Sequence, residues 1–404
     1  MPMPIPPKPA RAQQLLPKEC YYDPAWFERE QQELFSRAWT FACVVQDIPN
    51  PGDYKAVQIN RYPMVVIRGK DGDVRAYHNT CRHRGTKLFE DDQAGNCRHG
   101  IVCPYHAWTY NLDDGSLRGL PKRDLAFPDL DLKKHSLHKA AVGILGDLVF
   151  VNPQAEPEEE FEGWLGGVRE SHMWPHKIDM LSEKRPVRYD FQANWKGFCE
   201  NAMDGYHLSY LHDKTLMGPD IENQGWDAAG RHWIFMSEPA PDRERDTYYT
   251  RVPGVDTSVR HPAVYQFFPN SGLVTASTFF SAYTIVPVSP ERCYLELRTW
   301  MMPREKQDPS KKRVMPSSTS SHGHIMKDGK RYISLEELSC HAMESLDFQI
   351  EDMWVCEQQQ QALHSPMMEV GPLAQNGETA LTWFQQHILD YVPLPRPAVA
   401  MAAE

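Results

Sequence analysis

Cys81-Arg82-His83 opens the stretch that decides the fold, and Cys103-Pro104-Tyr105-His106 closes it, with residues 84–102 between the two motifs. Each motif offers one thiol and one imidazole at chelating spacing. Two thiolates and two imidazoles can bind structural zinc, or a [2Fe–2S] cluster in which two histidines ligate one iron. Zinc fingers usually pair cysteine with cysteine and histidine with histidine, whereas each motif here supplies one of each. The spacing therefore predicts a metal centre held by two loops, and it favours the dinuclear cluster.

Short β-rich runs surround both motifs from about Thr40 to Asn152. Met64–Ile67 and Leu148–Val151 are typical of buried strands, and Asp71-Gly72 is a hairpin signal. The region therefore predicts a small all-β module, whose sheet would hold the two metal-binding loops together.

The two motifs, followed by Ala107-Trp108-Thr109-Tyr110, resemble a Rieske domain. The resemblance implies four ligands to a [2Fe–2S] cluster, with one iron held by Cys81 and Cys103 and the other by His83 and His106. The gap between the motifs is slightly longer than the commonest family spacing. It contains Cys97 and His99, which we expect not to be ligands.

Asp204, His207 and His212 form a second group of metal-binding residue types. Asp204 and His207 are three residues apart, which would place them on one face of a helix. His207 and His212 are five apart, so both can face one ion only if the helix ends or bulges between them. The facial triad of non-haem Fe(II) oxygenases also needs a carboxylate. Asp352 is the best candidate, although spacing alone does not bring it near the histidines.

This second group resembles Rieske oxygenase catalytic subunits, which carry D-x2-H-x4-H and then a distant aspartate on a helix. The resemblance implies that His207, His212 and Asp352 hold a mononuclear iron, with Glu351 and Asp347 in reserve if the register differs. It also implies that Asp204 bridges His106 of one subunit and His207 of its neighbour. Asn201 matches a family residue near the iron. The sequence around Asp204 resembles that of ring-hydroxylating large subunits more than that of the quaternary-amine branch, where glutamate often replaces this aspartate.

The resemblance spans nearly the whole chain, starting at a helix that Asp23-Pro24 begins and that runs to about Trp39. It implies an α+β fold, in which an all-β Rieske [2Fe–2S] domain is inserted in a catalytic domain with an antiparallel sheet flanked by helices. We expect residues 1–39 to form an N-terminal arm and helix of the catalytic domain. Residues 40–155 would form the Rieske domain, and residues 156–404 the catalytic mononuclear-iron domain.

Three further patterns concern the later part of the chain. Thr278–Val288 and Cys293–Met301 are rich in aromatic and β-branched residues and predict adjacent antiparallel strands. Ser334 and Glu337 form a capping box, which predicts that a helical region begins there and continues to about Leu363. Five aromatic residues are candidates to line an apolar pocket: Phe267, Phe268, Phe279, Phe280 and Trp354.

Charge and cysteine content exclude several classes of protein. The chain carries 43 Lys and Arg against 54 Asp and Glu, a net charge of −11, so it lacks the positive field that nucleic acid requires. No apolar stretch approaches the roughly 20 residues that span a bilayer. Without a basic-then-apolar start, the sequence predicts a cytoplasmic protein. Nine cysteines indicate thiols or metal thiolates rather than a disulfide framework.

The resemblance implies the terminal component of an oxygenase. It would use O2 and electrons from NAD(P)H, delivered by a separate reductase with or without a ferredoxin, to hydroxylate or dihydroxylate an aromatic small molecule. The chain has no dinucleotide-binding fingerprint of its own. An oligomer, either a homotrimer or an α3β3 assembly, is expected. The alternatives are an N- or O-demethylase of a methylated amine or methoxy-aromatic substrate, an electron-transfer Rieske protein, and a zinc-binding interaction module.

Overall fold

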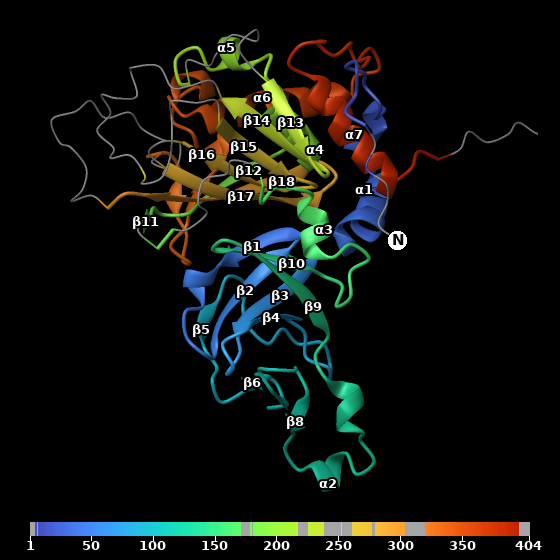
Figure 1. Cartoon of the computed structure of the whole chain (residues 1–404), viewed down its shortest axis with the longest axis vertical. Coiled ribbons are helices and arrows are strands. Elements are labelled where there is room, and N and C mark those ends of the chain that lie inside the picture. Colours follow the sequence, from blue (N-terminus) through green and yellow to red (C-terminus); the bar gives the residue numbers. More distant parts are fainter. Residues whose placement is uncertain are drawn as a thin grey trace, which may run out of the picture.

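A computed structural model of the chain describes residues 5, 7–170, 178–179, 181–216, 225–237, 252, 261–276, 279–303 and 320–395. Figure 1 shows two packed units, a broad one in which helices cover a large sheet and a narrower one built mainly from strands. We call the narrower one, which holds β1 to β10, the β unit. The broader one, which holds β11 to β20, is the mixed unit.

The β unit contains two sheets. A seven-stranded sheet has the order β1-β10-β9-β4-β3-β2-β5, and a three-stranded sheet has the order β6-β7-β8. The strands of the first sheet are β1 (Thr40–Val44), β2 (Asp53–Ile59), β3 (Tyr62–Arg68), β4 (Val74–His78), β5 (Ala94–Asn96), β9 (Lys139–Leu145) and β10 (Leu148–Asn152). Those of the second are β6 (Ile101–Val102), β7 (Thr109–Tyr110) and β8 (Leu117–Gly119), which α2 (Arg123–Ala126) and a 3-10 helix (Leu132–His135) follow.

The mixed unit is built on one sheet, which has ten strands among the described residues and is antiparallel except where β12 pairs with β20. Its main order is β13-β14-β15-β16-β17-β18-β12-β20-β19, and β11 pairs with β18. The strands are β11 (Ser182–Glu183), β12 (Val187–Phe191), β13 (Gly225–Ala229), β14 (His232–Ser237), β15 (His261–Phe267), β16 (Ser271–Thr275), β17 (Phe279–Ser289), β18 (Arg292–Met301), β19 (His324–Ile325) and β20 (Arg331–Ile333).

Helices cover one face of this sheet, as Figure 1 shows. They are α1 (Pro24–Arg29), α4 (Trp195–Met203), α6 (Phe348–Leu363) and α7 (Thr379–Tyr391). The short helix α5 (Leu208–Leu211) lies at the top of the view, and α3 (Phe161–Leu165) lies between the two units. Asp23 caps α1 ahead of Pro24, as the sequence predicts, and the helical path continues as a π-helix (Glu30–Leu34) and a 3-10 turn (Phe35–Arg37). Among the described helices, none combines the length and apolar character that a membrane span requires.

The N-terminal segment belongs to the core of the mixed unit. Leu16, Trp26 and Phe35 are buried in the same apolar cluster as residues of α4, α6 and α7. The chain therefore starts in the mixed unit, forms the β unit and then returns. This path confirms the expected α+β fold with an inserted β module.

An ion pair inside that core fastens the N-terminal segment to α4. The Lys196 ammonium lies 2.6 Å from a carboxylate oxygen of Glu30, and both side chains are completely buried. The indole N–H groups of Trp26 and Trp195 donate to the same carboxylate. Because a charge buried without partners is very costly, this cluster holds α4 in one position.

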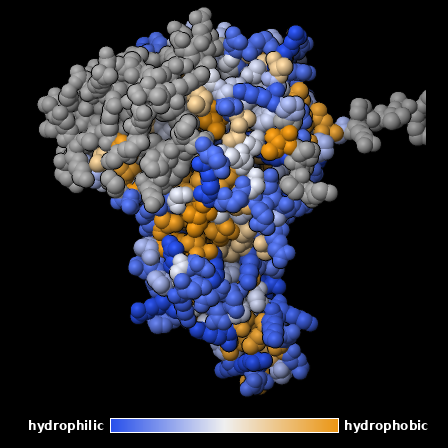
Figure 2. Space-filling view, in the orientation of Figure 1, coloured by the Kyte–Doolittle hydropathy of each residue, from blue (hydrophilic) through white to orange (hydrophobic). Residues whose placement is uncertain are grey.

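A second apolar cluster joins the two units through the opposite face of the large sheet. Phe41 and Phe150 of the β unit pack in one cluster with Trp164 of α3 and with Phe267 and Phe280 of the mixed unit. Figure 2 shows apolar surface at the level where the two units meet. Phe267 and Phe280, which the sequence offered as pocket-lining residues, are therefore core residues at this junction.

The structure confirms one pattern in the later chain and corrects another. Strands β17 and β18 pair as expected, with Ser289 opposite Arg292 at their turn. The helix predicted from Ser334 is wrong, since only a 3-10 turn (Leu335–Glu337) follows and the Ser334 side chain makes no capping bond. The Glu337 carboxylate is engaged by His324 instead. The long helix α6 begins later, after its N-cap Asp347.

Candidate metal centres

The two Cys–His motifs form loops with matching backbone hydrogen bonds. The amide of Cys81 donates to the Thr86 carbonyl at 2.9 Å, and the amide of Cys103 donates to the Trp108 carbonyl at 2.9 Å. In both loops the residue four positions after the cysteine donates back to the cysteine carbonyl, at 3.0 Å. Those residues are Gly85 and Ala107, and both adopt left-handed backbone angles, with φ of 74° and 55°.

This shared geometry places the four predicted cluster ligands together. The Cys81 and Cys103 side chains are buried, and the rings of His83 and His106 lie 4.7 Å apart between centroids. His83 also stacks on Trp108 at 4.8 Å, with 7° between the ring planes. The aromatic run after the second motif thus orients a histidine of the first.

The donors around these loops fit a [2Fe–2S] cluster. Within the described residues, the buried Nδ1 atom of His83 has no hydrogen-bond partner, which suits a ring nitrogen reserved for a metal. Burial raises the pKa of the Cys81 thiol, and the Tyr110 hydroxyl, 3.2 Å from Sγ, opposes this by favouring the thiolate. Two buried sulfurs and two adjacent imidazoles are the donor set of a Rieske-type cluster.

The remaining cysteines and the extra histidine have other environments. The Cys97 thiol contacts the Gly52 carbonyl, and His99 is exposed beside Arg98. None of the nine cysteines, all of which the structure describes, forms a disulfide.

The second group of residues lies where α4 ends and α5 begins. Asn194 caps the start of α4, accepting a hydrogen bond from the Lys196 amide at 3.0 Å. The helix stops at Asp204, whose backbone is extended, so the expectation that Asp204 and His207 share a helical face is wrong. His207 and His212 instead flank the short helix α5 on either side. This break lets both histidines turn toward one point.

His207, His212 and Asp352 meet at that point. Each offers one ligand atom, and the three atoms lie within 4.8 Å of one another. Asp352 Oδ1 is 3.0 Å from Nε2 of His212 and 3.7 Å from Nε2 of His207. Asp352 comes from α6, which packs against α4, so tertiary packing brings it to residues about 140 positions earlier in the chain.

Two further carboxylates contact the other nitrogen of each histidine. Asp204 Oδ2 is 3.0 Å from Nδ1 of His207, and Glu351 Oε2 is 2.7 Å from Nδ1 of His212. Glu351, which the sequence offered as an alternative ligand to Asp352, thus lies behind a histidine, away from the point where the three atoms meet. Asp347, the other reserve, is the N-cap of α6. The sequence contained no signal for the Glu351 contact, because it joins segments far apart in the chain.

The chemistry of this site fits a metal cation. Within the described part of the chain, Nε2 of His207 is buried without a hydrogen-bond partner. Burial opposes charge on His212, but hydrogen bonds to Asp352 and Glu351 outweigh burial and raise its pKa to about 9. The site therefore stabilises positive charge between the histidines and carboxylates. Two imidazoles and one carboxylate are the ligand set of mononuclear non-haem iron.

Asn201 lies in the last turn of α4, near this group in the sequence. Its side-chain oxygen is buried and has no hydrogen-bond partner among the described residues. No hydrogen bond joins its side-chain oxygen to the three clustered residues.

Comparison with known protein families decides the identity of the fold. A profile described as the ring-hydroxylating alpha subunit (catalytic domain) matches residues 178–394, more than half of the chain. A profile described as the Rieske [2Fe–2S] domain matches residues 38–131. The chain belongs to the Rieske oxygenase α-subunit family. A Rieske protein without a catalytic domain and a zinc-binding module are thereby excluded.

Relatives of this α subunit include both monooxygenases and dioxygenases. It is 36% identical over 203 residues to the glycine betaine monooxygenase oxygenase subunit of Chromohalobacter salexigens, covering 50% of this chain and 44% of the relative. It is 28% identical over 315 residues to the 2-aminobenzenesulfonate 2,3-dioxygenase subunit alpha of an Alcaligenes species, covering 74% and 77%. The match to the first relative thus spans less than half of that protein's length.

Solved structures share the fold over nearly the whole chain. The quaternary ammonium Rieske monooxygenase CntA superposes with a TM-score of 0.72 at 20% identity, covering 97% of this chain and all of that one. Naphthalene 1,2-dioxygenase from a Rhodococcus species superposes with a TM-score of 0.67 at 18% identity, covering 95% of each.

Two cavities lie near these elements in the α subunit. One, of about 310 Å³, adjoins Met203 and Gly205 on either side of Asp204 and is walled by Trp226, Trp233 and Phe235. The five aromatic residues that the sequence offered for an apolar pocket do not line it.

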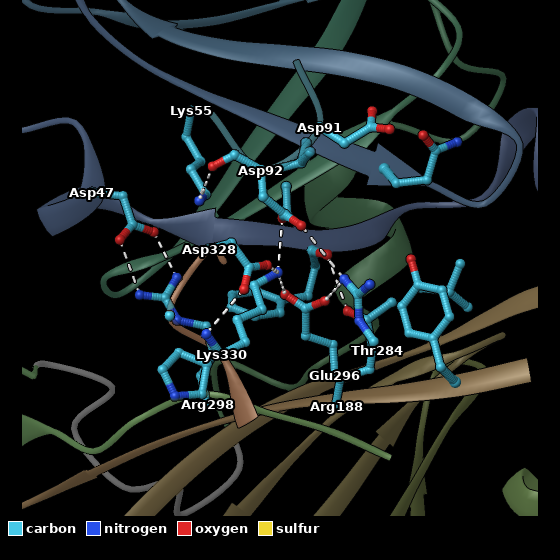
Figure 3. A pocket seen from close by; sticks show the side chains of 18 of the residues that line it. Asp47, Lys55, Asp91, Asp92, Arg188, Thr284, Glu296, Arg298, Asp328 and Lys330 are labelled. Carbon is cyan, nitrogen blue, oxygen red and sulfur yellow. Dashed lines mark hydrogen bonds and ion pairs between the residues drawn. The ribbon is translucent and has the colours of Figure 1, made fainter. Parts of the chain in front are cut away.

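The other cavity, of about 650 Å³, is a charged cleft between the two units (Figure 3). Three cations of the mixed unit contact carboxylates of both units: Arg188 and Lys330 join Asp92 to Glu296, and Arg298 joins Asp47 to Glu183. Because ion pairs between the two units occupy its lining, we interpret this cleft as a polar joint between the units.

Proposed function

We propose that this α subunit is a terminal oxygenase, which uses O2 and electrons from a separate NAD(P)H reductase, with or without a ferredoxin, to oxidise a small molecule. The observation that carries the proposal is the meeting of His207, His212 and Asp352 in a chain that also carries a family-matched Rieske [2Fe–2S] domain. An electron-transfer protein would need the cluster but would have no use for this second group.

The proposal assigns two sets of ligands. Cys81 and Cys103 hold one iron of the cluster and His83 and His106 hold the other, while His207, His212 and Asp352 hold the mononuclear iron. Residues 40–155 form the Rieske domain, which is inserted between residues 1–39 and 156–404 of the catalytic domain. The buried ring nitrogens of His83 and His207 that lack partners support both assignments.

The protein's own residues orient and shield these sites. A mononuclear iron with three protein ligands supplies open positions at which O2 is activated. Asp204 and Glu351 accept the Nδ1 protons of His207 and His212, so the Nε2 atoms, which lie on the side of Asp352, would be the atoms that hold a metal. His212 and Asp352 are almost completely buried, which restricts water at this position.

We propose that Asp204 carries electrons between subunits by bridging His106 of one copy and His207 of the next. Its side chain is 17% exposed, and it stands beside the exposed rings of Tyr206 and Tyr210. The loops that hold His106 expose Val102 and Tyr105. These surfaces support head-to-tail contacts in a trimer or an α3β3 assembly. Inter-subunit electron transfer has been described for a quaternary ammonium Rieske monooxygenase of the same fold.

The proposed reaction is hydroxylation or dihydroxylation of an aromatic ring. A specific observation also favours the second candidate, oxidative demethylation of a methylated amine. Trp226, which forms one wall of the 310 Å³ cavity, has the Lys8 ammonium over its ring, 3.8 Å from the centroid. Aromatic walls of this kind suit alkylammonium groups as well as aromatic rings.

Reconstitution with a reductase tests the function and separates the two candidates. A panel of aromatic acids, aromatic hydrocarbons and methylated amines should yield hydroxylated products or formaldehyde, dependent on O2. His212→Ala should abolish either activity while the cluster absorption remains. Failure of every panel member to consume O2 above the uncoupled background would contradict an oxygenase of these substrate classes.

A second experiment tests the electron route. Asp204→Asn keeps the size of the side chain but puts an amide donor where an acceptor is needed. We expect this variant to retain both metal centres, to be reduced normally at the cluster and to form almost no product. A fully active variant, or an active monomer, would refute the inter-subunit bridge.

A further inference from the structure

The two histidines of the mononuclear site are backed by carboxylates in contrasting surroundings. Asp204, behind His207, is 17% exposed. Glu351, behind His212, is 2% exposed, and its histidine is 1% exposed. The shorter of the two contacts, at 2.7 Å, is the buried one. A hydrogen bond to a carboxylate is strongest where solvent cannot compete, so the two pairs are not equivalent.

Glu351 is also held by a second donor. The Thr215 hydroxyl donates to the same carboxylate oxygen that faces His212, at 2.7 Å. Thr215 itself follows α5, and its amide donates to the His212 carbonyl at 3.2 Å. The Glu351 carboxylate therefore fastens α6 to the segment that ends α5, and its position leaves His212 one ring orientation.

We propose that Glu351 is the positioning residue that sets the metal affinity of the mononuclear site, whereas Asp204 contributes little to that affinity. The proposal rests on the function proposed above. By accepting the Nδ1 proton, Glu351 keeps the Nε2 lone pair of His212 free and raises its basicity as a ligand. Asp204 makes a longer contact at a more exposed position, which suits contact with another chain better than control of the metal.

The division of roles predicts losses of metal affinity of different size for the two carboxylates. Loss of a carboxylate behind a metal-bound histidine typically weakens metal binding by about 10–100-fold. We expect this loss in Glu351→Ala and a smaller one in Glu351→Gln, because the amide oxygen still accepts a hydrogen bond. For Asp204→Asn we expect a smaller loss than for Glu351→Gln, because the contact of Asp204 with its histidine is longer and more exposed to solvent.

Cobalt(II) is the probe, because bound cobalt is counted separately from the iron of the cluster. Full-length protein with its cluster intact is cleared of mononuclear metal by a chelator and dialysed against a series of free Co(II) concentrations. Glu357→Gln is the matched control, since Glu357 also lies on α6, is 8% exposed and accepts a hydrogen bond from the Gln192 amide at 3.0 Å. It should bind cobalt like the parent protein, with an unchanged cluster spectrum.

The outcomes separate this proposal from the function on which it rests. If His212→Ala binds cobalt like the parent protein, the metal site itself has been misassigned. If His212→Ala loses cobalt but Glu351→Ala and Glu351→Gln stay within threefold of the parent, the positioning role is overturned. Should Glu351→Ala fail to fold, Thr215→Val supplies the test, because it removes only the hydroxyl that holds the carboxylate. It should weaken cobalt binding relative to the parent protein, although by less than Glu351→Gln does. Cobalt binding as tight as the parent's, or tighter, would overturn the proposal.

Discussion

Replacing Asp347 with asparagine should stabilise the protein increasingly as the pH rises. Asp347 is the N-cap of α6, the helix that bears Asp352, and it accepts from the Gln349 amide at 3.0 Å. Burial, which outweighs hydrogen bonds from Ser320, Gln349 and Tyr189, raises the pKa of Asp347 to about 6 from an ordinary 3.8. Asparagine caps helices as well as aspartate but carries no charge to bury.

The sign follows from linkage between protonation and folding. Because the folded-state pKa is the higher one, the folded protein binds the extra proton, and that stabilisation is fully present below pH 3.8 and lost as the pH rises through 6. A shift of this size means that the charge on Asp347 lowers the free energy of unfolding by about 3 kcal/mol at pH 8 and by about 1.5 kcal/mol at pH 5. The advantage of the asparagine variant should thus grow by about 1.5 kcal/mol between these values. The lost acceptor for Tyr189 adds a cost of about 1 kcal/mol at every pH.

Calorimetric melting of parent and variant between pH 5 and pH 8 measures this difference. A gain of about 1.5 kcal/mol should raise the melting temperature of the variant, relative to the parent, by roughly 2 °C across the range. Asp23→Asn is the control, because Asp23 also caps a helix but is partly exposed to solvent. A melting difference that stays constant from pH 5 to pH 8 would refute the reasoning, whatever its absolute size.

Three further perturbations test other parts of the structure. Cys103→Ser should bleach the cluster absorption and end turnover, because a thiolate ligand is lost; a retained spectrum would remove Cys103 from the ligand set. Lys196→Met should destabilise the protein by about 3–5 kcal/mol in urea unfolding, because it leaves the Glu30 carboxylate buried without its cation, and adding Glu30→Gln should recover much of the loss. Asp92→Asn removes a carboxylate shared by Arg188 and Lys330 and should lower the free energy of unfolding by about 1–3 kcal/mol. The control, Asp91→Asn, breaks only a surface pair with Lys87 and should lower it by less than about 1 kcal/mol.

Local sequence signals predicted the parts of this fold that depend on neighbours in the chain. The paired strands β17 and β18 and the N-cap at Asp23 follow from β-branched and aromatic runs and from cap chemistry. The requirement that a helix break between His207 and His212 followed from helical geometry, and the short helix α5 meets it. The capping box at Ser334 failed because Glu337, the residue that should complete it, contacts His324 across the chain.

The features that spacing alone left open are those that depend on tertiary packing. Asp352 reaches the histidines because α6 lies against α4, and the choice among Asp347, Glu351 and Asp352 depends on which face of α6 turns toward α5. On that helix Asp352 faces the two Nε2 atoms, Glu351 passes behind His212, and Asp347 caps the end. Three acidic residues within six positions thus take three different roles, because each points in a different direction from one helix. The acidic composition of the segment identifies the candidates, but only the packing of α6 assigns their roles.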